Sequence, residues 1–583
     1  MSISTELSSV ARSLPLSKKI IILVLLIIGG ATIISSLWKL NNTVLVGVPE
    51  NGGVLREGVI GAPRFINPLL AISDTDRDLS AVIYSGLMRK GTDGQFIPDL
   101  AERFDISNDG KTYTFYLRKN LTWHDGKPIT ANDVVFTINK AVDPAVKSPK
   151  AINWEGVGVT AQSDRVIIFN LPQPYSAFIG ETTIGILPSH IWGQIASETL
   201  AFSELNAQPI GSGPYMIKSV KYSSDGLPIY YNLSAFKDFA LGKAHIEEIT
   251  FYFYPNEEEL IDAAQKNIID NLGGITPLSA QKLQRFGAKV KQTPLPRVFG
   301  IFWNQNEAKI FTQSEVRKAL EQSLDRKYIV ENILENFATP IDGPLPPSSI
   351  GYEKKIGLSE PIGLRIQKAK NLLTSAGWEK GSDGILQKTV GKETLRLEFT
   401  ITTADTTELK AIARLAENTW EKMGAKVTIK VQDLSDLQQT SIRPRKYDAL
   451  LFGMSTGADS DLYSFWHSSE RSDPGLNVAM YANPSADKLL EKIKTEQNRN
   501  LLAGDIKKLN TIIRNDHPAV FIYSPDFIYV ISEDIREMDL PYINIPADRF
   551  AHIYDWYLAT DKVWPFFAPD NTASDTASTT KNI

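Results

Sequence analysis

The sequence FYLRKNLTWHDGKPITANDV, at residues 115–134, combines the end of a β-strand, a turn and the start of a helix. It follows the turn-forming residues 107–111, SNDGK, and the alternating β-forming residues 112–117 predict the second strand of a hairpin. Asp125-Gly126 predicts a further turn. Residues 130–133, TAND, are typical of a capping box, and the apolar residues that follow predict a helix with one buried face.

Strand and helix signals alternate along the rest of the chain, which favours an α/β class. No internal repeat or low-complexity block interrupts this pattern between the linker at 41–52 and Pro569. From Pro569 onward the chain is small, polar and unpatterned, so residues 566–583 are predicted to be a disordered tail.

Residues 115–134 resemble, almost position for position, the pattern F-x-L-R-x-x-x-x-W-x-D-G-x-P-x-T-A-x-D-V of the extracellular solute-binding proteins of peptide-type ABC importers, the family 5 group. Further segments match this family in order, from about residue 53 to 557: NPL at 67–69, YSGL at 84–87, PDLAE at 98–102, PIGSGPY at 209–215, VRKAL at 316–320, LDR at 324–326, LLTSAGW at 372–378, YDA at 447–449 and PADRF at 546–550. Such an ordered set is far more specific than any one motif.

The resemblance implies an α/β, two-lobed periplasmic-binding-protein-like (class II) fold with an inserted subdomain. The apolar run at residues 20–38 adds one predicted N-terminal transmembrane helix before it, which departs from the common pattern of the family. The resemblance places hinges near residues 293 and 510. The implied boundaries are as follows: cytoplasmic N-terminus 1–19, transmembrane anchor 20–38, linker 39–52, solute-binding domain 53–560, with lobe I at about 44–82, 209–293 and 511–560, the inserted subdomain at about 83–208 and lobe II at about 294–510.

The predicted anchor is the uncharged run at residues 20–38, which at helical rise spans roughly 28 Å, close to the thickness of a bilayer core. Arg12, Lys18 and Lys19 precede the run and only Lys39 follows closely, so the large domain is expected on the extracytoplasmic side of a cell membrane. The alternative is a cleaved signal peptide, whose apolar core is normally shorter and ends in a small-residue site that is not evident here.

Composition narrows the classes of partner. The chain has 583 residues, a formal net charge of -5 and no basic tract, so nucleic acid is not an expected partner. It has no cysteine, and its six histidines are scattered, so no cofactor or metal is predicted. The expected partners are a small peptide or other solute, ABC transporter permease subunits and the membrane, with the protein acting as a monomer.

In relatives that bind peptides, an aspartate after a strand of the second lobe pairs with the peptide ammonium. That position falls on Gly457 here, so the nearest carboxylates, Asp459 first and Asp461 second, are the candidates, and a solvated acidic loop is the alternative. Four more residues are candidates for the ligand cleft, with core packing as the alternative for the tryptophan at 466: Trp466, Asn477, Trp303 and Asn304.

The resemblance therefore predicts a membrane-anchored binding protein that captures peptides, or a similar solute, and delivers them to an ABC importer. One alternative is a ligand sensor that acts through a membrane partner. Another is a serine hydrolase, because residues 453–457, GMSTG, match G-x-S-x-G around Ser455. The residues after this motif do not predict the helix that such a nucleophile needs, so the chain is not expected to be an enzyme.

Overall fold

The computed structural model describes residues 15–564 except 93, 176, 355–359, 458–460, 497 and 541–542. Two compact units are distinguished by their internal contacts: one comprises residues 1–52 and 557–583, and the other residues 53–556. The tail predicted at 566–583 lies outside the described residues.

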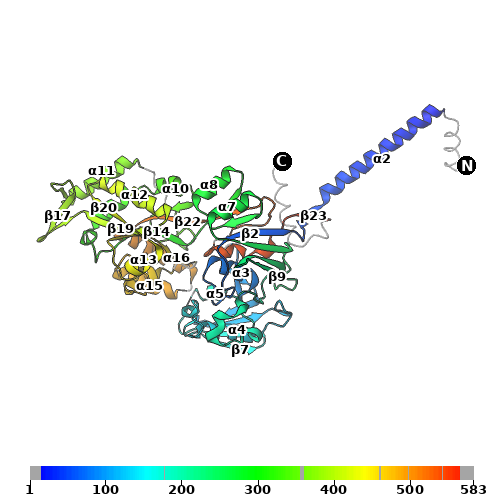
Figure 1. Cartoon of the computed structure of the whole chain (residues 1–583), viewed down its shortest axis with the longest axis horizontal. Helices are drawn as coiled ribbons and strands as arrows, with labels where there is room; N and C mark the ends of the chain where they lie inside the picture. The colour runs from blue at the N-terminus through cyan, green and yellow to red at the C-terminus, as the bar shows by residue number, and fades with distance from the viewer. Residues whose placement is uncertain are drawn as a thin grey trace. The chain divides into compact units, whose positions relative to one another are not determined.

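The smaller unit contains helix α2 (Leu16–Val44) and an antiparallel pair of strands, β1 (Val46–Pro49) and β23 (Thr560–Val563). The apolar run at 20–38 lies within α2, which is drawn in dark blue in Figure 1. A search of the residues that the structure describes found no helix both long and apolar enough to cross a membrane. The predicted membrane span is therefore not confirmed.

One large mixed sheet runs through the larger unit (Figure 1). Its parallel and antiparallel neighbours follow in this spatial order: β20 (Lys426–Gln432), β19 (Glu398–Ala404), β21 (Ala449–Ser455), β14 (Arg297–Trp303), β22 (Ala519–Ile531), β12 (Asn271–Gly273), β2 (Val54–Ile60), β11 (Glu248–Tyr254), β10 (Pro228–Ala235) and β9 (Tyr215–Tyr222). We call the half built on β2 and β9–β12 the first lobe, and the half built on β14 and β19–β21 the second lobe.

Strand β22 belongs to both lobes. Its first residues pair with β14, for example Ala519 with Phe302, whereas its last residues pair with β13 (Lys289–Pro294), for example Ile531 with Lys289. Between them, the Ser524 hydroxyl donates a hydrogen bond to the Leu295 carbonyl at 2.9 Å, where the chain passes from β13 to β14. The lobes are thus joined by two adjacent crossing segments, near 294–297 and 523–526, while residue 510 lies inside α16 (Arg499–Asp516).

Helices cover both halves of the sheet. The first lobe carries α3 (Asp74–Ile83), α7 (Glu257–Gln265) and α8 (Pro277–Arg285). Besides α16, the second lobe carries α9 (Ser314–Ser323), α10 (Arg326–Asn332), α11 (Ile362–Ser375), α12 (Thr407–Glu421), α13 (Leu434–Asp436), α14 (Leu462–Trp466) and α15 (Pro484–Thr495), with β15 (Ala338–Pro340) and a small sheet of β16 (Glu379–Lys380), β17 (Leu386–Val390) and β18 (Glu393–Arg396).

A separate antiparallel sheet, at the bottom of Figure 1, contains residues 115–117, the start of the segment quoted first above. Its strands lie in the order β5 (Ala101–Ile106), β6 (Thr112–Leu117), β8 (Val166–Asn170) and β7 (Gly158–Ser163), and it is accompanied by α4 (Ala131–Val142), α5 (Phe178–Glu181), α6 (Ser189–Trp192) and the hairpin of β3 (Met88–Lys90) and β4 (Phe96–Pro98). The pairing of β5 with β6 confirms the predicted hairpin. The capping box of α4 is also confirmed, because Asp133 accepts a hydrogen bond from the Thr130 backbone at 2.8 Å.

Two of the family motifs are joined by one histidine. The His124 ring is hydrogen-bonded to the Gly211 N–H at 3.2 Å through Nδ1 and to the Gly213 carbonyl at 3.1 Å through Nε2. Burial lowers the pKa of His124 to about 4, so the ring is neutral at neutral pH. A Cβ atom at position 211 would lie 1.9 Å from the Ile83 carbonyl oxygen, so the chain can pass the end of α3 this closely only with glycine there.

Candidate ligand-binding site

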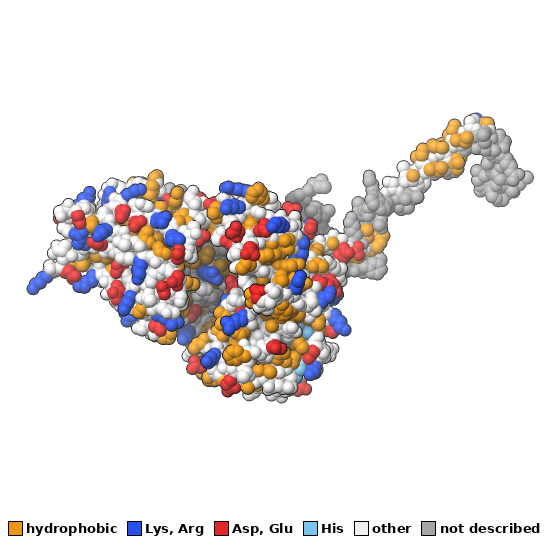
Figure 2. All heavy atoms as spheres, viewed as in Figure 1, with side chains coloured by type: hydrophobic (Ala, Val, Ile, Leu, Met, Phe, Trp, Pro, Cys, Tyr) orange, Lys and Arg blue, Asp and Glu red, His pale blue; other side chains and the backbone are white. Residues whose placement is uncertain are grey.

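A cavity of about 480 Å³ lies within the larger unit. Its wall is formed by segments that are far apart in the sequence: α3, β3, residues 150–154, residues 180–185, residues 544–551 and Gly457. Gly457 is the contribution of the second lobe, from the loop after β21, whereas the other segments belong to the first lobe and the inserted subdomain. Figure 2 shows that the surface is hollowed where the two lobes meet.

The charged side chains in this wall are the basic Arg77, Arg89, Lys90 and Lys150 and the acidic Asp99, Glu181 and Asp548. Arg89 and Asp99 form a buried pair: Nε and one terminal nitrogen of Arg89 donate to the same oxygen of Asp99, at 3.0 and 2.7 Å. The other terminal nitrogen donates to the Ala551 carbonyl at 2.6 Å. Burial raises the pKa of Asp99, and the Arg89 charge opposes that shift. This pair therefore helps to hold the wall together, although the other Asp99 oxygen, Oδ1, is buried without a hydrogen-bond partner among the described residues.

Lys90 and Asp548 are also engaged by the protein. The Lys90 ammonium donates to the Asn544 side chain at 2.7 Å and lies 3.8 Å from Asp548. Asp548 accepts hydrogen bonds from the backbone of Asn544, at 2.7 Å, and of Ile545, which caps the short helix η7 (Pro546–Phe550). The PADRF motif thus shapes one side of the cavity.

Lys150 and Glu181 differ in whether their charged groups have a hydrogen-bond partner within the protein. The Glu181 carboxylate accepts a hydrogen bond from the Asn153 amide at 2.6 Å. The Lys150 ammonium, by contrast, makes no hydrogen bond or ion pair with any described residue. Burial lowers its pKa, the Glu181 charge opposes that shift and the Arg77 charge adds to it. Arg77 is more exposed and lies 3.6 Å from Asp74, one turn earlier on α3.

The predicted carboxylates of the second lobe are placed as follows. Asp459 lies outside the described residues. Asp461 is the N-cap of α14 and accepts a hydrogen bond from the Ser464 N–H at 3.2 Å, with its second oxygen 2.5 Å from the Ser464 hydroxyl. Gly457, the position of the family's aspartate, lines the cavity and has φ of +67°, a conformation that favours glycine. A role for Asp459 or Asp461 in binding the ligand stays a prediction.

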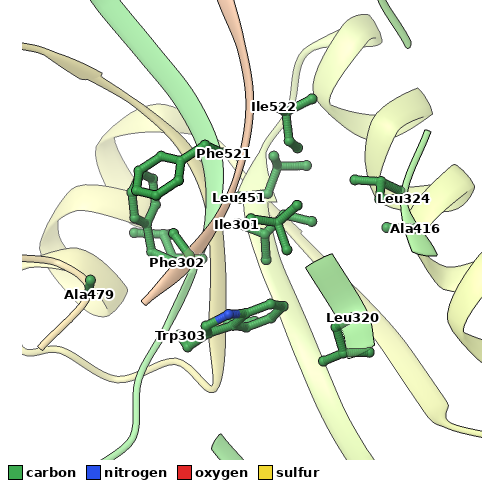
Figure 3. Close-up of a cluster of buried hydrophobic side chains, with 14 of the residues drawn as sticks. Ile301, Phe302, Trp303, Leu320, Leu324, Ala416, Leu451, Ala479, Phe521 and Ile522 are labelled. Carbon is green, nitrogen blue, oxygen red and sulfur yellow. The ribbon is translucent and has the colours of Figure 1, made fainter. Parts of the chain in front are cut away.

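Trp303 and Asn304 lie at the end of β14, inside the second lobe. Trp303 is fully buried and stacks on Phe311, with ring centroids 4.6 Å apart, and Figure 3 shows it among apolar side chains of that core. The Asn304 amide donates to the Arg445 carbonyl at 2.8 Å, and its oxygen accepts from the backbone of Asn306. Packing and loop bracing account for both side chains in this conformation.

Trp466 and Asn477 are likewise buried in the second lobe. The Trp466 ring packs against Tyr481 and Phe521, at centroid distances of 5.9 and 5.6 Å. The Asn477 amide donates to the carbonyls of His467 and Tyr481, and its oxygen accepts from the Tyr481 N–H. None of the four buried candidates lines the cavity, so their contact with a ligand stays a prediction.

Sequence reasoning missed the basic residues of the wall, which are Arg77, Arg89, Lys90 and Lys150. They are ordinary surface-type residues in three different segments, and no local pattern brings the segments together. The signal that was present is the set of family motifs itself, since YSGL at 84–87, PDLAE at 98–102 and PADRF at 546–550 border the cavity.

The G-x-S-x-G match does not form a nucleophile elbow. Ser455 ends β21, the chain turns at Gly457, and the next helix, α14, begins at Leu462. A nucleophile elbow needs a helix directly after the serine. Among the described residues, no group of three or more His, Asp or Glu side chains is arranged to hold a metal ion.

Comparison with known proteins identifies the family. A sequence profile of the bacterial extracellular solute-binding proteins, family 5 middle, matches residues 95–474. The chain belongs to this family. Its members are binding proteins of ABC importers and not enzymes, which confirms both the resemblance and the prediction that the chain is no hydrolase.

The chain is similar to individual relatives over most of their length. The chain is 29% identical over 522 residues to the oligopeptide-binding protein AppA of Bacillus subtilis, which covers 88% of this chain and 93% of the relative. It is 26% identical to protein XP55 of Streptomyces lividans, over 82% of this chain and 84% of that one.

Solved structures confirm the two-lobed α/β fold. AppA of Bacillus subtilis in complex with a nonapeptide superposes with a TM-score of 0.66 at 27% identity, covering 88% of this chain and 100% of that one. The ABC transporter substrate-binding protein CtaP of Listeria monocytogenes gives a TM-score of 0.74 at 27% identity, over 87% and 100% of the two chains.

Proposed function

We propose that this family 5 protein captures a peptide, or a solute of similar size, in the cavity that Gly457 and the first lobe enclose. The observation that carries the proposal is this cavity, because it is bordered by both lobes and by several of the family's motifs. The names of relatives support the ligand class, since AppA is an oligopeptide-binding protein and was crystallised with a nonapeptide. Asp459, with Asp461 as the second candidate, is proposed to meet the peptide ammonium.

The two crossing segments are proposed to act as the hinge. Rotation about residues 294–297 and 523–526 would close the lobes over the solute, and closure changes the surface that a transporter meets. In this proposal the closed, loaded monomer delivers its solute to the permease subunits of an ABC importer. The boundaries predicted for the lobes and the inserted subdomain belong to the same proposal.

The apolar run at 20–38 is proposed to anchor the protein in the cell membrane, with the large unit on the extracytoplasmic side. Support comes from the sequence, which has no charge over these residues and basic residues before them. The side chains of Ile21, Leu23 and Leu25 are more than half exposed, so they have no protein core to bury them. A membrane would take that role for the isolated helix.

Binding is tested on the purified full-length chain in mild detergent, by thermal unfolding and calorimetry against di- to nonapeptides, oligosaccharides and metal chelates. A solute that binds only the folded state raises the melting temperature. We expect peptides to do so, with a loss of affinity in Asp459→Asn if that carboxylate meets the ammonium. Stabilisation by sugars alone would overturn the peptide proposal and retain a solute-binding role.

Anchoring is tested by fractionating cells that express the full chain or the chain without residues 1–44. We expect the full chain in membranes that have been washed with alkaline carbonate, and the shortened chain in the soluble fraction. If the chain expressed at full length is instead recovered free of the membrane and cleaved near Ser35, this would support the signal-peptide alternative.

A further inference from the structure

Some charged groups of the cavity wall have hydrogen-bond or ion-pair partners within the protein, and one has none among the described residues. Each of its three carboxylates is already used by the protein: Asp99 by Arg89, Glu181 by Asn153 and Asp548 by backbone N–H groups. The Lys150 ammonium has no such partner among the described residues. The charges of Glu181 and Asp548 act on Lys150 only from a distance, without a direct hydrogen bond or ion pair. A partly buried cation without a direct partner is costly, and a bound anion would reduce that cost.

Lys150 is held on a rigid support. The Ser148 hydroxyl donates to the Leu69 carbonyl at 2.7 Å and accepts from the Lys150 N–H at 3.1 Å, which fixes the backbone beside the first lobe. Directly after Lys150 comes the short helix η1 (Ala151–Trp154), whose Trp154 is buried against Phe169 and Phe178. The backbone that carries the Lys150 side chain is therefore ordered, so it needs little reorganisation when the ammonium binds an anion.

A second cation faces the same cavity. Arg77 projects from α3, whose N-terminus is fixed by a capping box at Ser73, and its contact with Asp74 at 3.6 Å is longer than a direct hydrogen bond. Its charge lowers the pKa of Lys150, so the two cations are near enough to repel each other. Two neighbouring cations with free donors are a site at which a carboxylate can accept several charge-assisted hydrogen bonds.

From this arrangement we infer that Lys150 and Arg77 form a carboxylate-binding subsite in the cavity. The preferred solute is then a peptide whose acidic group lies beside these two residues. The inference rests on the proposed function and narrows its ligand class. The carboxylate can come from the peptide C-terminus or from an aspartate or glutamate side chain. Gly457 contributes no side chain to the described wall, and the three carboxylates of that wall already have partners in the protein.

The test uses the full-length protein and matched tripeptides and pentapeptides that differ in one group: C-terminal acid against C-terminal amide, and glutamate against glutamine. Calorimetry gives the affinity of each. For at least one pair we expect the acid to bind the wild type more than about tenfold better than its neutral partner, the scale of one charge-assisted hydrogen bond. The pair that shows the difference identifies the source of the carboxylate.

Variants assign the effect to the subsite. Lys150→Met should abolish the preference for the acid, Lys150→Arg should retain most of it, and Arg77→Met should reduce it. Lys119→Met, an exposed lysine away from the cavity, is the matched control and should behave as the wild type. A preference that survives in Lys150→Met, with the fold checked by circular dichroism, would overturn the inference.

The result also separates this inference from the proposed function. If acids and their neutral partners bind the wild type equally, the peptide role stands and the subsite is refuted. If no peptide binds, glutarate and tricarballylate are used as small probes. Stabilisation by these acids that is lost in Lys150→Met would keep the subsite while refuting the peptide role, and no stabilisation would refute both.

Discussion

Asp526 lies on β22 where the strand passes between the lobes, and its Oδ1 atom is buried without a hydrogen-bond partner among the described residues. Burial raises the pKa of this carboxyl from 3.8 to about 6. Because the unfolded chain releases the proton at lower pH, the contribution of Asp526 to stability is present below pH 4 and lost as the pH rises through 6. We expect Asp526→Asn to raise the free energy of unfolding by about 2–3 kcal/mol at pH 7.5 and to leave it nearly unchanged at pH 3.5.

Urea unfolding at the two pH values measures this effect. Asp225→Asn, in the exposed turn between β9 and β10, is the control and should change little at either pH. An equal gain in Asp526→Asn at pH 3.5 and 7.5 would show that the carboxyl is not the titrating group.

Arg549 holds two buried carboxylates inside the first lobe. Its terminal nitrogens donate to Asp78 at 2.8 and 2.6 Å and to Glu57 at 3.0 Å, and Glu57 also accepts from the Tyr529 hydroxyl at 2.7 Å. Burial raises the pKa of both acids against the opposing Arg549 charge. We expect Arg549→Met to lower the free energy of unfolding by about 3–5 kcal/mol, since it leaves the acids without their cation.

Chemical denaturation at pH 7.5 measures that loss. The variant that also carries Glu57→Gln and Asp78→Asn should recover a large part of it, because no buried charge then remains unpaired. If the triple variant is no more stable than Arg549→Met, packing of the arginine stem and not its charge stabilises this cluster.

At the scale of single elements, most predictions that the structure confirms were made from residues close together in the sequence. The turn residues at 107–111 and the capping residues Thr130 and Asp133 act on neighbours within a few positions, so one sequence suffices to place them. The run at 20–38 was predicted from apolarity alone, and it does lie in one helix, but its role as a membrane span is not confirmed.

Gly211, the first glycine of the PIGSGPY motif, lies very close to the backbone at the end of α3. An alanine Cβ at position 211 would meet the Ile83 carbonyl oxygen at 1.9 Å, so the backbone at the end of α3 would have to move. We expect Gly211→Ala to destabilise the protein by more than about 2 kcal/mol, as other strained core changes do. Thermal unfolding of the purified variant measures the loss.

Gly504→Ala in α16 is the matched control, because its Cβ would meet no atom within 4 Å. There the substitution should stabilise the helix by up to about 1 kcal/mol. A Gly211→Ala variant as stable as the control would mean that the PIGSGPY segment is free to relax.

At the scale of the whole molecule, the site depends on positions that no local pattern joins. Arg77, Lys150 and Gly457 meet at one cavity only because three separate parts of the fold bring them there. The family resemblance led to candidates in the second lobe, and four of these, Trp303, Asn304, Trp466 and Asn477, pack in its interior. Residue type alone cannot distinguish a buried tryptophan from one in a binding cleft, since both require an apolar contact surface.

Shared strand β22 should also couple the two lobes in unfolding. We expect the larger unit to unfold in one cooperative transition, because loss of β22 removes a neighbour from β14 in one lobe and from β12 and β13 in the other. Hydrogen exchange followed by mass spectrometry, on peptides from β21 and from β11, should give the same global opening free energy. Two well-separated values would show that each lobe unfolds independently.

The position of β22 in the chain has a consequence for how the protein is made. Residues 519–531 leave the ribosome after every other strand of both lobes, so each lobe lacks a strand of its sheet until about nine-tenths of the polypeptide exists. Until then the edges of β14 and β12 have no β22 to pair with, and neither lobe can complete its core. A chain built in this order can complete the sheet of β5–β8 early, but it completes neither lobe until most of its synthesis is over.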